Sequence, residues 1–213
     1  AKDFKGRVDY RQTTILCIDP EGAMDHDDAI SIERTPTGYK LGVHIADVSY
    51  YIPEGSPMDE EALERSYTQY LPWTAVPMIP EELSSDICSL HENVDRCAHT
   101  CMMLLDKQGN VTSWEFHKSI VRITKSITYQ QAMELYKQGD SDVKLLAEVT
   151  ALLKTNRTKE GLLEFRSTEL GCRFNEAGEP TEIFPRTTDI SNSWVEECML
   201  IANNCCAKEL KPR

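Results

Sequence analysis

Apolar residues in the first half of the chain come in short runs separated by turn residues, a pattern that predicts strands rather than long helices. The runs expected to form strands are 13–18, 28–34, 39–48, 98–105, 111–116 and 118–125, with shorter ones at 161–170 and 181–184. Turn residues lie at 35–38 and 106–110, so the strands on either side of each turn are expected to pair as antiparallel hairpins.

Helix signals occur at four places. Ser56-Pro57 combines a capping residue with proline at the first helical position and predicts a helix to about residue 70. Capping residues and apolar periodicity predict further helices at 129–138, 142–156 and 191–209. Residues 71–80 contain three prolines, which excludes a helix or a central strand and predicts an ordered extended loop. Antiparallel hairpins with segregated helices are typical of an α+β fold built on a mixed, mainly antiparallel sheet.

Composition narrows the class of protein. The 213 residues, of which 40% are hydrophobic and 27% charged, suit one globular domain with a sizeable core. No apolar run approaches the ~20 residues of a membrane span, and the polar amino terminus lacks a signal-peptide core. Eight cysteines lie mostly inside apolar runs, so a reducing compartment, the cytoplasm, is expected.

Four carboxylates within ten residues, Asp19, Asp25, Asp27 and Asp28, lie between two of the predicted strands. Like charges held beside a core raise carboxylate pKa values and cost stability, and a divalent cation is the simplest compensation. Oxygen ligands without a His/Cys cluster favour magnesium, manganese or calcium over zinc. The alternative is a solvated acidic turn without a metal.

The residues that flank these acids, and the spacing between them, indicate which kind of site the acids could form. Asp19-Pro20 is expected to end one strand, Gly22 to allow a tight turn, and Asp27-Asp28 to begin the next strand, so that the acids meet at one place. The spacing does not match the calcium loop of an EF-hand. His26 stands between two of the acids. An outer-shell role is open to it, but its place between Asp25 and Asp27 favours a side chain that faces away from them.

Five blocks of sequence, in order along the chain, carry a resemblance to a known family. They are Cys17-Ile-Asp-Pro-Glu-Gly-Ala-Met-Asp-His-Asp-Asp-Ala-Ile30, Gly42-Val-His-Ile-Ala-Asp-Val48, Tyr70-Leu-Pro72 with Pro77-Met-Ile-Pro80, Leu83-Ser-Ser-Asp-Ile-Cys-Ser-Leu90 and Glu196-Glu-Cys-Met-Leu-Ile-Ala-Asn203. Together they resemble the ribonuclease II/ribonuclease R (RNB) exoribonuclease family from about residue 13 to 210. The resemblance implies a sheet whose helices wall an RNA channel, and processive, magnesium-dependent 3′→5′ hydrolysis of single-stranded RNA to nucleoside 5′-monophosphates.

The resemblance also implies residue roles. Asp19 and Asp28 match the main ligands of Mg²⁺, for which Mn²⁺ is a possible substitute. Asp27 matches the acid whose loss most selectively stops cleavage, and Asp25 completes the catalytic and metal-binding set. RNA contacts are implied for Tyr70 and Phe165, which match a pair that clamps the 3′-terminal nucleotide, for Tyr129 near a ribose, and for Glu197 near the 3′ end.

His44 and Asp47 suggest a catalytic pair, but the position of His44 in the middle of a predicted strand favours a hydrogen-bonded structural histidine. Residues 1–12 are expected to be a linker from a preceding region, and 13–213 an RNB catalytic domain lacking its C-terminal third. The resemblance implies that the full protein adds a Thr-Ser-Pro-Ile-Arg-Arg-Tyr block, with an arginine for the scissile phosphate, and oligonucleotide-binding barrels.

The net charge of −12 is unusual for a protein that binds nucleic acid. It predicts that RNA is held in a narrow internal channel or by basic segments elsewhere in a longer protein. Because the resemblance implies that the phosphate-facing arginine and the barrels are not among these 213 residues, the 213 residues alone are expected to be weakly active or inactive. Two other functions stay open. One is a catalytically inactive RNB-like module that binds RNA or a protein, and the other is a magnesium-dependent nuclease that acts on DNA.

Overall fold

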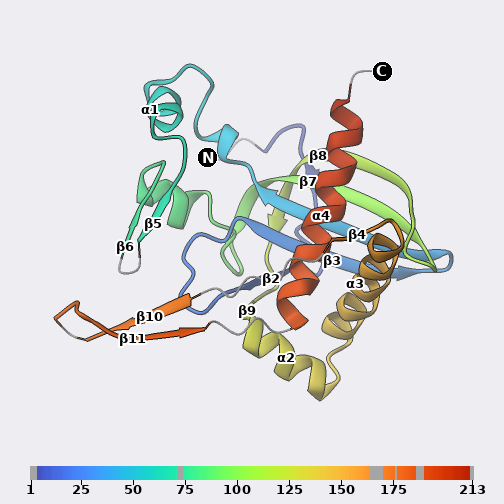
Figure 1. The fold of residues 1–213 in the computed structure, drawn as a ribbon. Helices are drawn as coiled ribbons and strands as arrows, with labels where there is room; N and C mark the ends of the chain where they lie inside the picture. Colours follow the sequence, from blue (N-terminus) through green and yellow to red (C-terminus); the bar gives the residue numbers. More distant parts are fainter. Residues whose placement is uncertain (1–3, 72–73, 164–169, 176, 186–189, 212–213) are drawn as a thin grey trace.

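The computed structural model describes residues 4–71, 74–163, 170–175, 177–185 and 190–211. Its centre is a seven-stranded sheet in the order β1-β8-β7-β4-β3-β2-β9 (Figure 1). The strands are β1 (Val8–Asp9), β2 (Leu16–Asp19), β3 (Asp28–Thr35), β4 (Gly38–Ala46), β7 (Asp95–Asp106), β8 (Val111–Arg122) and β9 (Lys125–Thr128). Pairing from β8 through β2 is antiparallel, while β1 and β9 at the two edges pair in parallel with β8 and β2. The predicted α+β class with a mixed, mainly antiparallel sheet is confirmed.

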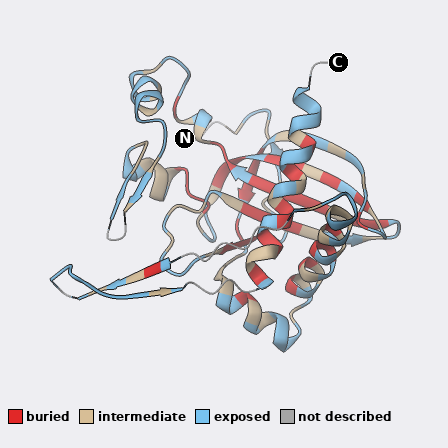
Figure 2. Ribbon diagram, in the orientation of Figure 1, coloured by how far each residue is buried: buried red, intermediate tan, exposed pale blue. Residues whose placement is uncertain are grey.

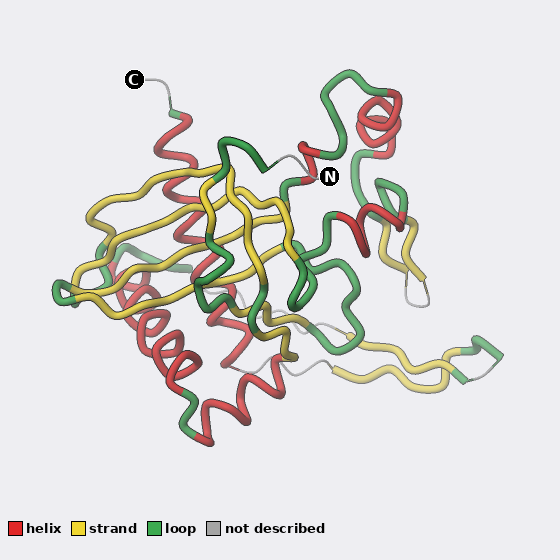
Figure 3. The backbone as a smooth tube through the Cα atoms, turned by 180° about the vertical axis from the view of Figure 1, so that it is seen from behind, coloured by secondary structure: helices red, strands yellow, loops and turns green. Residues whose placement is uncertain are grey.

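Three helices cover one face of this sheet: α2 (Tyr129–Gln138), α3 (Ser141–Lys159) and α4 (Ile190–Leu210), as the views from the two sides show (Figures 1 and 3). Residues coloured as buried gather where the helices meet the strands (Figure 2). Leu16, Ile30 and Met103 from the sheet pack in one cluster with Leu146 of α3 and Cys198 of α4. A smaller cluster includes Ile15, Cys17, Ala29, Leu90 and Val121.

Smaller elements lie outside the sheet and the three helices. They are a 3-10 turn at Val48–Tyr50, α1 (Pro57–Arg65), the hairpin of β5 (Gln69–Leu71) and β6 (Thr74–Val76), a π-helical turn at Leu83–Ile87, and the hairpin of β10 (Leu170–Phe174) and β11 (Pro180–Pro185). Both hairpins project away from the main sheet (Figures 1 and 3). None of the helices within the described ranges is long and apolar enough to cross a membrane.

Most predicted elements are present, with four differences, and most of the strand predicted at 161–170 lies outside the described residues. The helix predicted to reach residue 70 ends at Arg65, because Ser66 takes a positive φ of 70° and the chain leaves the helix. The extended loop predicted at 71–80 instead continues a two-stranded hairpin that begins at Gln69, outside the central sheet. β8 is one continuous strand rather than two, and β9 was not predicted.

Part of the segment predicted to be a linker belongs to the sheet. Val8 and Asp9 pair with Ser119 and Ile120 of β8. Arg7 reaches the buried carboxylate of Asp47 at 2.6 Å. Residues 7–9 are therefore held by the fold rather than free of it.

His44 lies at the centre of a buried polar network in the sheet. Its Nε2 is 2.9 Å from Ser31 Oγ and its Nδ1 is 2.8 Å from Thr100 Oγ1. Asp47 instead binds Arg7 and His99, the latter at 3.1 Å. The structural interpretation of His44 is confirmed, and His44 and Asp47 do not form a catalytic pair. Full burial lowers the pKa of His44 from 6.5 to about 3.

This buried histidine predicts a loss of stability in acid. The unfolded chain takes up a proton near pH 6.5, whereas folded His44 stays neutral down to about pH 3, so the free energy of unfolding falls as pH drops through that window. At ~1.4 kcal/mol per unit, His44 accounts for a loss of about 2 kcal/mol between pH 6.5 and pH 5. Urea unfolding across this range should show a shallower pH dependence for His44→Gln than for wild type. His117→Gln is the control, and equal slopes for wild type and His44→Gln would contradict the prediction.

Candidate active site

The ends of β2 and β3 bring the predicted acids together. These strands pair antiparallel with Leu16 opposite Ile30, so the last residue of β2, Asp19, lies at the same end of the pair as the first residue of β3, Asp28. Residues 20–27 join the two strands, and Gly22 takes a φ of 81° that side-chain-bearing residues rarely adopt. The connection is a loop, so its acids need not alternate between faces as they would along a strand.

Backbone hydrogen bonds fix this loop. Ser89 Oγ accepts from the backbone N–H of His26 and donates to the carbonyl of Met24, both at 2.9 Å, and Leu90 N–H donates to the carbonyl of His26 at 2.9 Å. Arg96, itself buried, donates through Nε to the carbonyl of Ser89 at 2.8 Å. The acidic loop is therefore held through Ser89 by a residue of β7. Sequence reasoning did not single out Ser89 or Arg96, although Ser89 stands in one of the quoted motif blocks.

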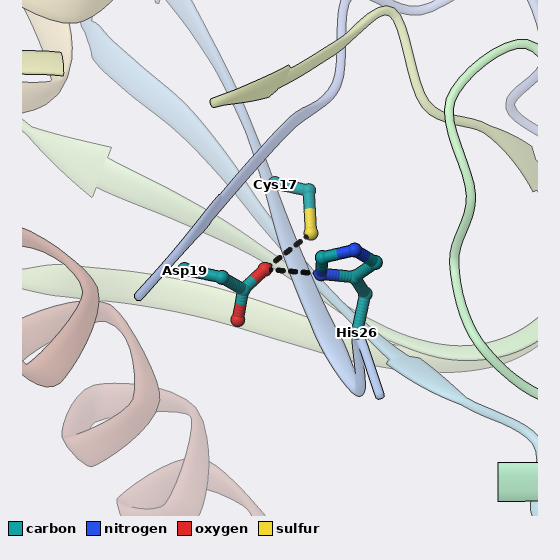
Figure 4. Close-up of side chains that lie close together, drawn as sticks. All are labelled: Cys17, Asp19 and His26. Carbon is teal, nitrogen blue, oxygen red and sulfur yellow. Dashed lines mark hydrogen bonds and ion pairs between the residues drawn. The ribbon is translucent and has the colours of Figure 1, made fainter. Parts of the chain in front are cut away.

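Asp19 is the most heavily contacted of the four acids. His26 Nδ1 lies 2.7 Å from Asp19 Oδ2, and Cys17 Sγ donates to the same oxygen at 2.9 Å. The second carboxylate oxygen of Asp19 points away from both (Figure 4). The prediction that His26 faces away is wrong, because the loop turns its ring toward the strand end. The assumption that no His/Cys cluster accompanies the acids is also wrong, since Cys17 projects from β2 on the same face as Asp19.

Electrostatics show how crowded the acids are. Burial, followed by the charges of Asp19 and Asp27, raises the pKa of Asp28 from 3.8 to about 6. Partial burial, followed by the charges of Asp25 and Asp19, raises the pKa of Asp27. Burial and the neighbouring Asp19 also raise the pKa of the Cys17 thiol, so this sulfur is a hydrogen-bond donor in the metal-free protein. Each raised carboxyl pKa is a free-energy cost of ionisation that a bound cation would remove.

Two of the predicted aromatic residues lie beside these acids. Tyr70, on β5, donates from its hydroxyl to Asp25 Oδ2 at 3.1 Å, and 71% of the residue is exposed. Tyr129, the first residue of α2, is half-buried, and burial followed by the charges of Asp19 and Asp28 raises the pKa of its hydroxyl. The structure therefore brings Tyr70, Tyr129 and the acids to one end of the sheet.

The other two predicted RNA contacts are placed differently. Glu197 is buried on α4, where Arg157 of α3 binds its two carboxylate oxygens at 2.6 and 3.1 Å. An RNA contact by Glu197 stays a prediction, and such a contact would have to coexist with this ion pair. Phe165 lies outside the described residues.

The donor set suits a hard divalent cation. The carboxylates of Asp19 and Asp28 come from adjacent strand ends, and Asp25 and Asp27 stand in the loop between them. Carboxylate oxygens are the preferred ligands of Mg²⁺ and Mn²⁺. Burial and the neighbouring acids raise the pKa values of Asp27 and Asp28 even though His26 acts in the opposite direction, so a cation bound here would favour the ionised carboxylates. The chemistry of these residues fits such an ion, although the donor atoms that lie within 4.8 Å of one another in the described part of the chain are those of Cys17, Asp19 and His26.

Comparison with known proteins gives a consistent family. The family model described as "RNB domain" matches residues 7–213. Ribonuclease R 1 of Lactococcus lactis subsp. lactis is 38% identical over 216 residues, which cover 96% of this chain and 26% of that protein. Ribonuclease R of Aquifex aeolicus is 37% identical over 222 residues, which cover 99% of this chain and 31% of that protein.

A solved structure agrees with these matches. Mycoplasma genitalium RNase R in complex with ribose methylated single-stranded RNA superposes with a TM-score of 0.92 at 27% identity, covering 97% of this chain and 34% of that one. This chain therefore spans about a quarter to a third of the proteins it matches.

Removing one of the crowded charges should stabilise the metal-free protein. Because the pKa of Asp28 is about 6 in the folded chain and 3.8 in the unfolded chain, ionisation of Asp28 lowers the free energy of unfolding. The loss is complete above about pH 6 and disappears as pH falls below 3.8. Asp28→Asn should therefore raise the free energy of unfolding by roughly 1–3 kcal/mol at pH 8 in the presence of a chelator. Glu21→Gln, an exposed change in the same loop, should have little effect. Thermal unfolding of the three proteins measures this, and a destabilised Asp28→Asn would refute it.

Proposed function

The chain belongs to the RNB family, and from this premise we propose that the protein degrades single-stranded RNA from its 3′ end in a magnesium-dependent reaction that releases nucleoside 5′-monophosphates. The observation that carries the proposal is the convergence of four acids at the shared end of β2 and β3, two of them with raised pKa values. Such a carboxylate cluster supports metal-assisted phosphodiester hydrolysis.

In this proposal Asp19 and Asp28 hold the ion, with Asp25 and Asp27 around it. When bound, magnesium supplies a positive charge that orients the scissile phosphate, lowers the pKa of a water and stabilises the leaving oxygen. Cys17 and His26 steady Asp19 through its Oδ2, which leaves the second oxygen for the ion (Figure 4). Asp27 stands closest in the chain to Asp28 and is assigned the role of orienting the attacking water.

The proposed RNA path runs past the aromatic side chains at this end of the sheet. The exposed ring of Tyr70 offers a stacking surface for a base, and such stacking contributes about 1–3 kcal/mol per base without regard to sequence. Its hydroxyl bond to Asp25 ties that surface to the acids. Tyr129 and Glu197 are assigned contacts to the last nucleotides, from α2 and α4 respectively.

The acidic charge of the chain bears on how RNA is held. A net charge of −12 repels phosphates, so we propose that further segments of a longer protein supply most of the RNA affinity. The share of each relative that this chain covers, 26% and 31%, supports this. On this basis the 213 residues by themselves are expected to cleave slowly or not at all, and activity is best measured on the protein at its natural length.

One cleavage assay distinguishes the proposed RNA-degrading enzyme from the two other functions that the sequence leaves open. An inactive RNB-like module would bind RNA or a protein and leave a labelled oligonucleotide intact in the presence of magnesium. A nuclease acting on DNA would shorten an oligodeoxynucleotide as fast as its RNA counterpart. The retention of all four acids favours the active RNA-degrading enzyme over the inactive module. We also propose a cytoplasmic location, since none of the eight cysteines, all of which lie in the described part of the chain, forms a disulfide.

The metal proposal predicts one site for a hard cation. Titration calorimetry with Mn²⁺ should show one binding event for wild type, and Asp19→Ala and Asp28→Asn should each abolish it, because each removes a charged ligand. Glu21→Gln should bind as wild type does. Unchanged Mn²⁺ binding in both Asp19→Ala and Asp28→Asn would show that these two residues are not the ligands.

The proposed role of Asp27 predicts a selective loss of chemistry. Asp27→Asn keeps the shape of the side chain and removes one repulsive charge, so folding and RNA binding should be preserved while cleavage falls by roughly 10²-fold or more. The measurements are degradation of 5′-labelled oligo-uridine with magnesium and fluorescence anisotropy for binding. Glu21→Gln is again the matched control. Wild-type cleavage by Asp27→Asn would show that this carboxylate is dispensable.

A further inference from the structure

We propose that Cys17, Asp19 and His26 form a second metal site, which takes Zn²⁺ or a similar transition-metal ion and shares Asp19 with the proposed magnesium site. One ligand atom from each residue, Sγ, a carboxylate oxygen and a ring nitrogen, lies within 4.8 Å of the other two. All three side chains converge on one point (Figure 4). The binding of this softer ion is independent of the proposed catalytic function, and only its effect on cleavage rests on that function.

The chemistry of the three donors differs from that of the acids alone. A thiolate, an imidazole and a carboxylate are together the ligands of zinc rather than of magnesium. Tetrahedral zinc with bonds of about 2.0–2.3 Å separates its ligand atoms by roughly 3.4–3.6 Å. The present separations from Asp19 Oδ2 are 2.7 Å to His26 and 2.9 Å to Cys17, so each of these two has to lengthen by less than about 1 Å, while the third pair already lies within 4.8 Å.

The fold positions these donors before any ion arrives. Cys17 and Asp19 are two residues apart on β2 and so project on one face, and the parallel pairing of β2 with β9 holds Cys17 opposite Ser126 and Asp19 opposite Thr128. The backbone of His26 is fixed at both its N–H and its carbonyl, by Ser89 and Leu90. Little conformational entropy is therefore left to lose when the three side chains bind a metal.

Access is from the side of the acids. The side chains of His26 and Asp19 are 15% and 18% exposed, whereas Cys17 is fully buried. The ring of His91 packs edge-on against that of His26 at 5.8 Å between centroids. Three protein ligands leave the fourth tetrahedral position for water. Binding replaces the thiol proton that Cys17 donates to Asp19, and that proton passes to solvent.

Sharing of Asp19 makes the two sites compete. An ion held by Cys17, Asp19 and His26 takes negative charge from Asp19 and places a second positive charge beside the magnesium ligands. Zinc should therefore inhibit cleavage even when magnesium is in excess. Replacement of Cys17 should relieve this inhibition without removing any of the four acids.

Cobalt is the spectroscopic probe, because Co²⁺ occupies zinc sites and a cobalt–thiolate bond absorbs in the near ultraviolet. The full-length protein should take up one Co²⁺ with a thiolate band. Cys17→Ser should lose the band and bind at least 10-fold more weakly, whereas Cys172→Ser, which alters a thiol on β10, should behave as wild type. His26→Gln keeps the thiol and should also bind at least 10-fold more weakly, which covers the case that Cys17→Ser fails to fold.

The outcomes are distinct. Absence of a thiolate band in wild type at millimolar Co²⁺, or an unchanged band in both Cys17→Ser and His26→Gln, overturns the site. In cleavage assays with excess Mg²⁺, at least 10-fold more Zn²⁺ should be needed to inhibit Cys17→Ser than wild type, and equal inhibition overturns the sharing of Asp19. If wild type shows the cobalt band but cleaves no RNA with Mg²⁺ alone, the proposed function fails while the metal site stands.

Discussion

Repulsion between carboxylates is the constraint on which the arrangement of this protein depends. The antiparallel pairing of β2 with β3 places Asp19 and Asp28 at one strand end, and the loop between them adds Asp25 and Asp27. Burial and mutual repulsion raise the pKa of Asp28 to about 6, so the metal-free site costs folding free energy. Such a cluster of acids persists only where the surrounding structure holds the carboxylates in place against their mutual repulsion.

Two separate sets of contacts hold the acids in place. On the helical face, the cluster that joins Leu16 and Ile30 to Leu146 and Cys198 secures the two strands from which Asp19 and Asp28 project. The loop is secured separately by hydrogen bonds from Ser89, which Arg96 holds in turn. Rigid strands fix the two acids at the strand ends, and backbone hydrogen bonds fix the two in the loop, so none depends on a long flexible connection.

Asp19 is the meeting point of two kinds of ligand chemistry. One of its oxygens is engaged by a thiol and an imidazole, while the other is turned away from them (Figure 4). Hard and soft cations prefer different partners of this one carboxylate. On the proposals above, the residues at positions 17 and 26 would set how well the acidic cluster distinguishes magnesium from transition metals.

Local patterns in the sequence determined much of the fold. Alternating runs and turn residues predicted the hairpins, and the capping residue Thr128 with Gly139 set the two ends of α2, because these signals act within a few residues. The four acids and their place between two strands were also evident, since a dense acidic stretch between apolar runs is a local feature.

Only the tertiary structure decided which groups surround those acids. Three contacts here join residues that are far apart in the chain: β9 pairs in parallel with β2, Ser89 holds the acidic loop, and Tyr70 donates a hydrogen bond to Asp25. No local pattern in the sequence specifies such partners. His26 was predicted to face away because strand alternation was extended into a loop, where backbone hydrogen bonds rather than a two-residue period set the direction of a side chain. The sequence by itself thus determined that charge gathers at one strand end, whereas long-range packing decided what that charge touches.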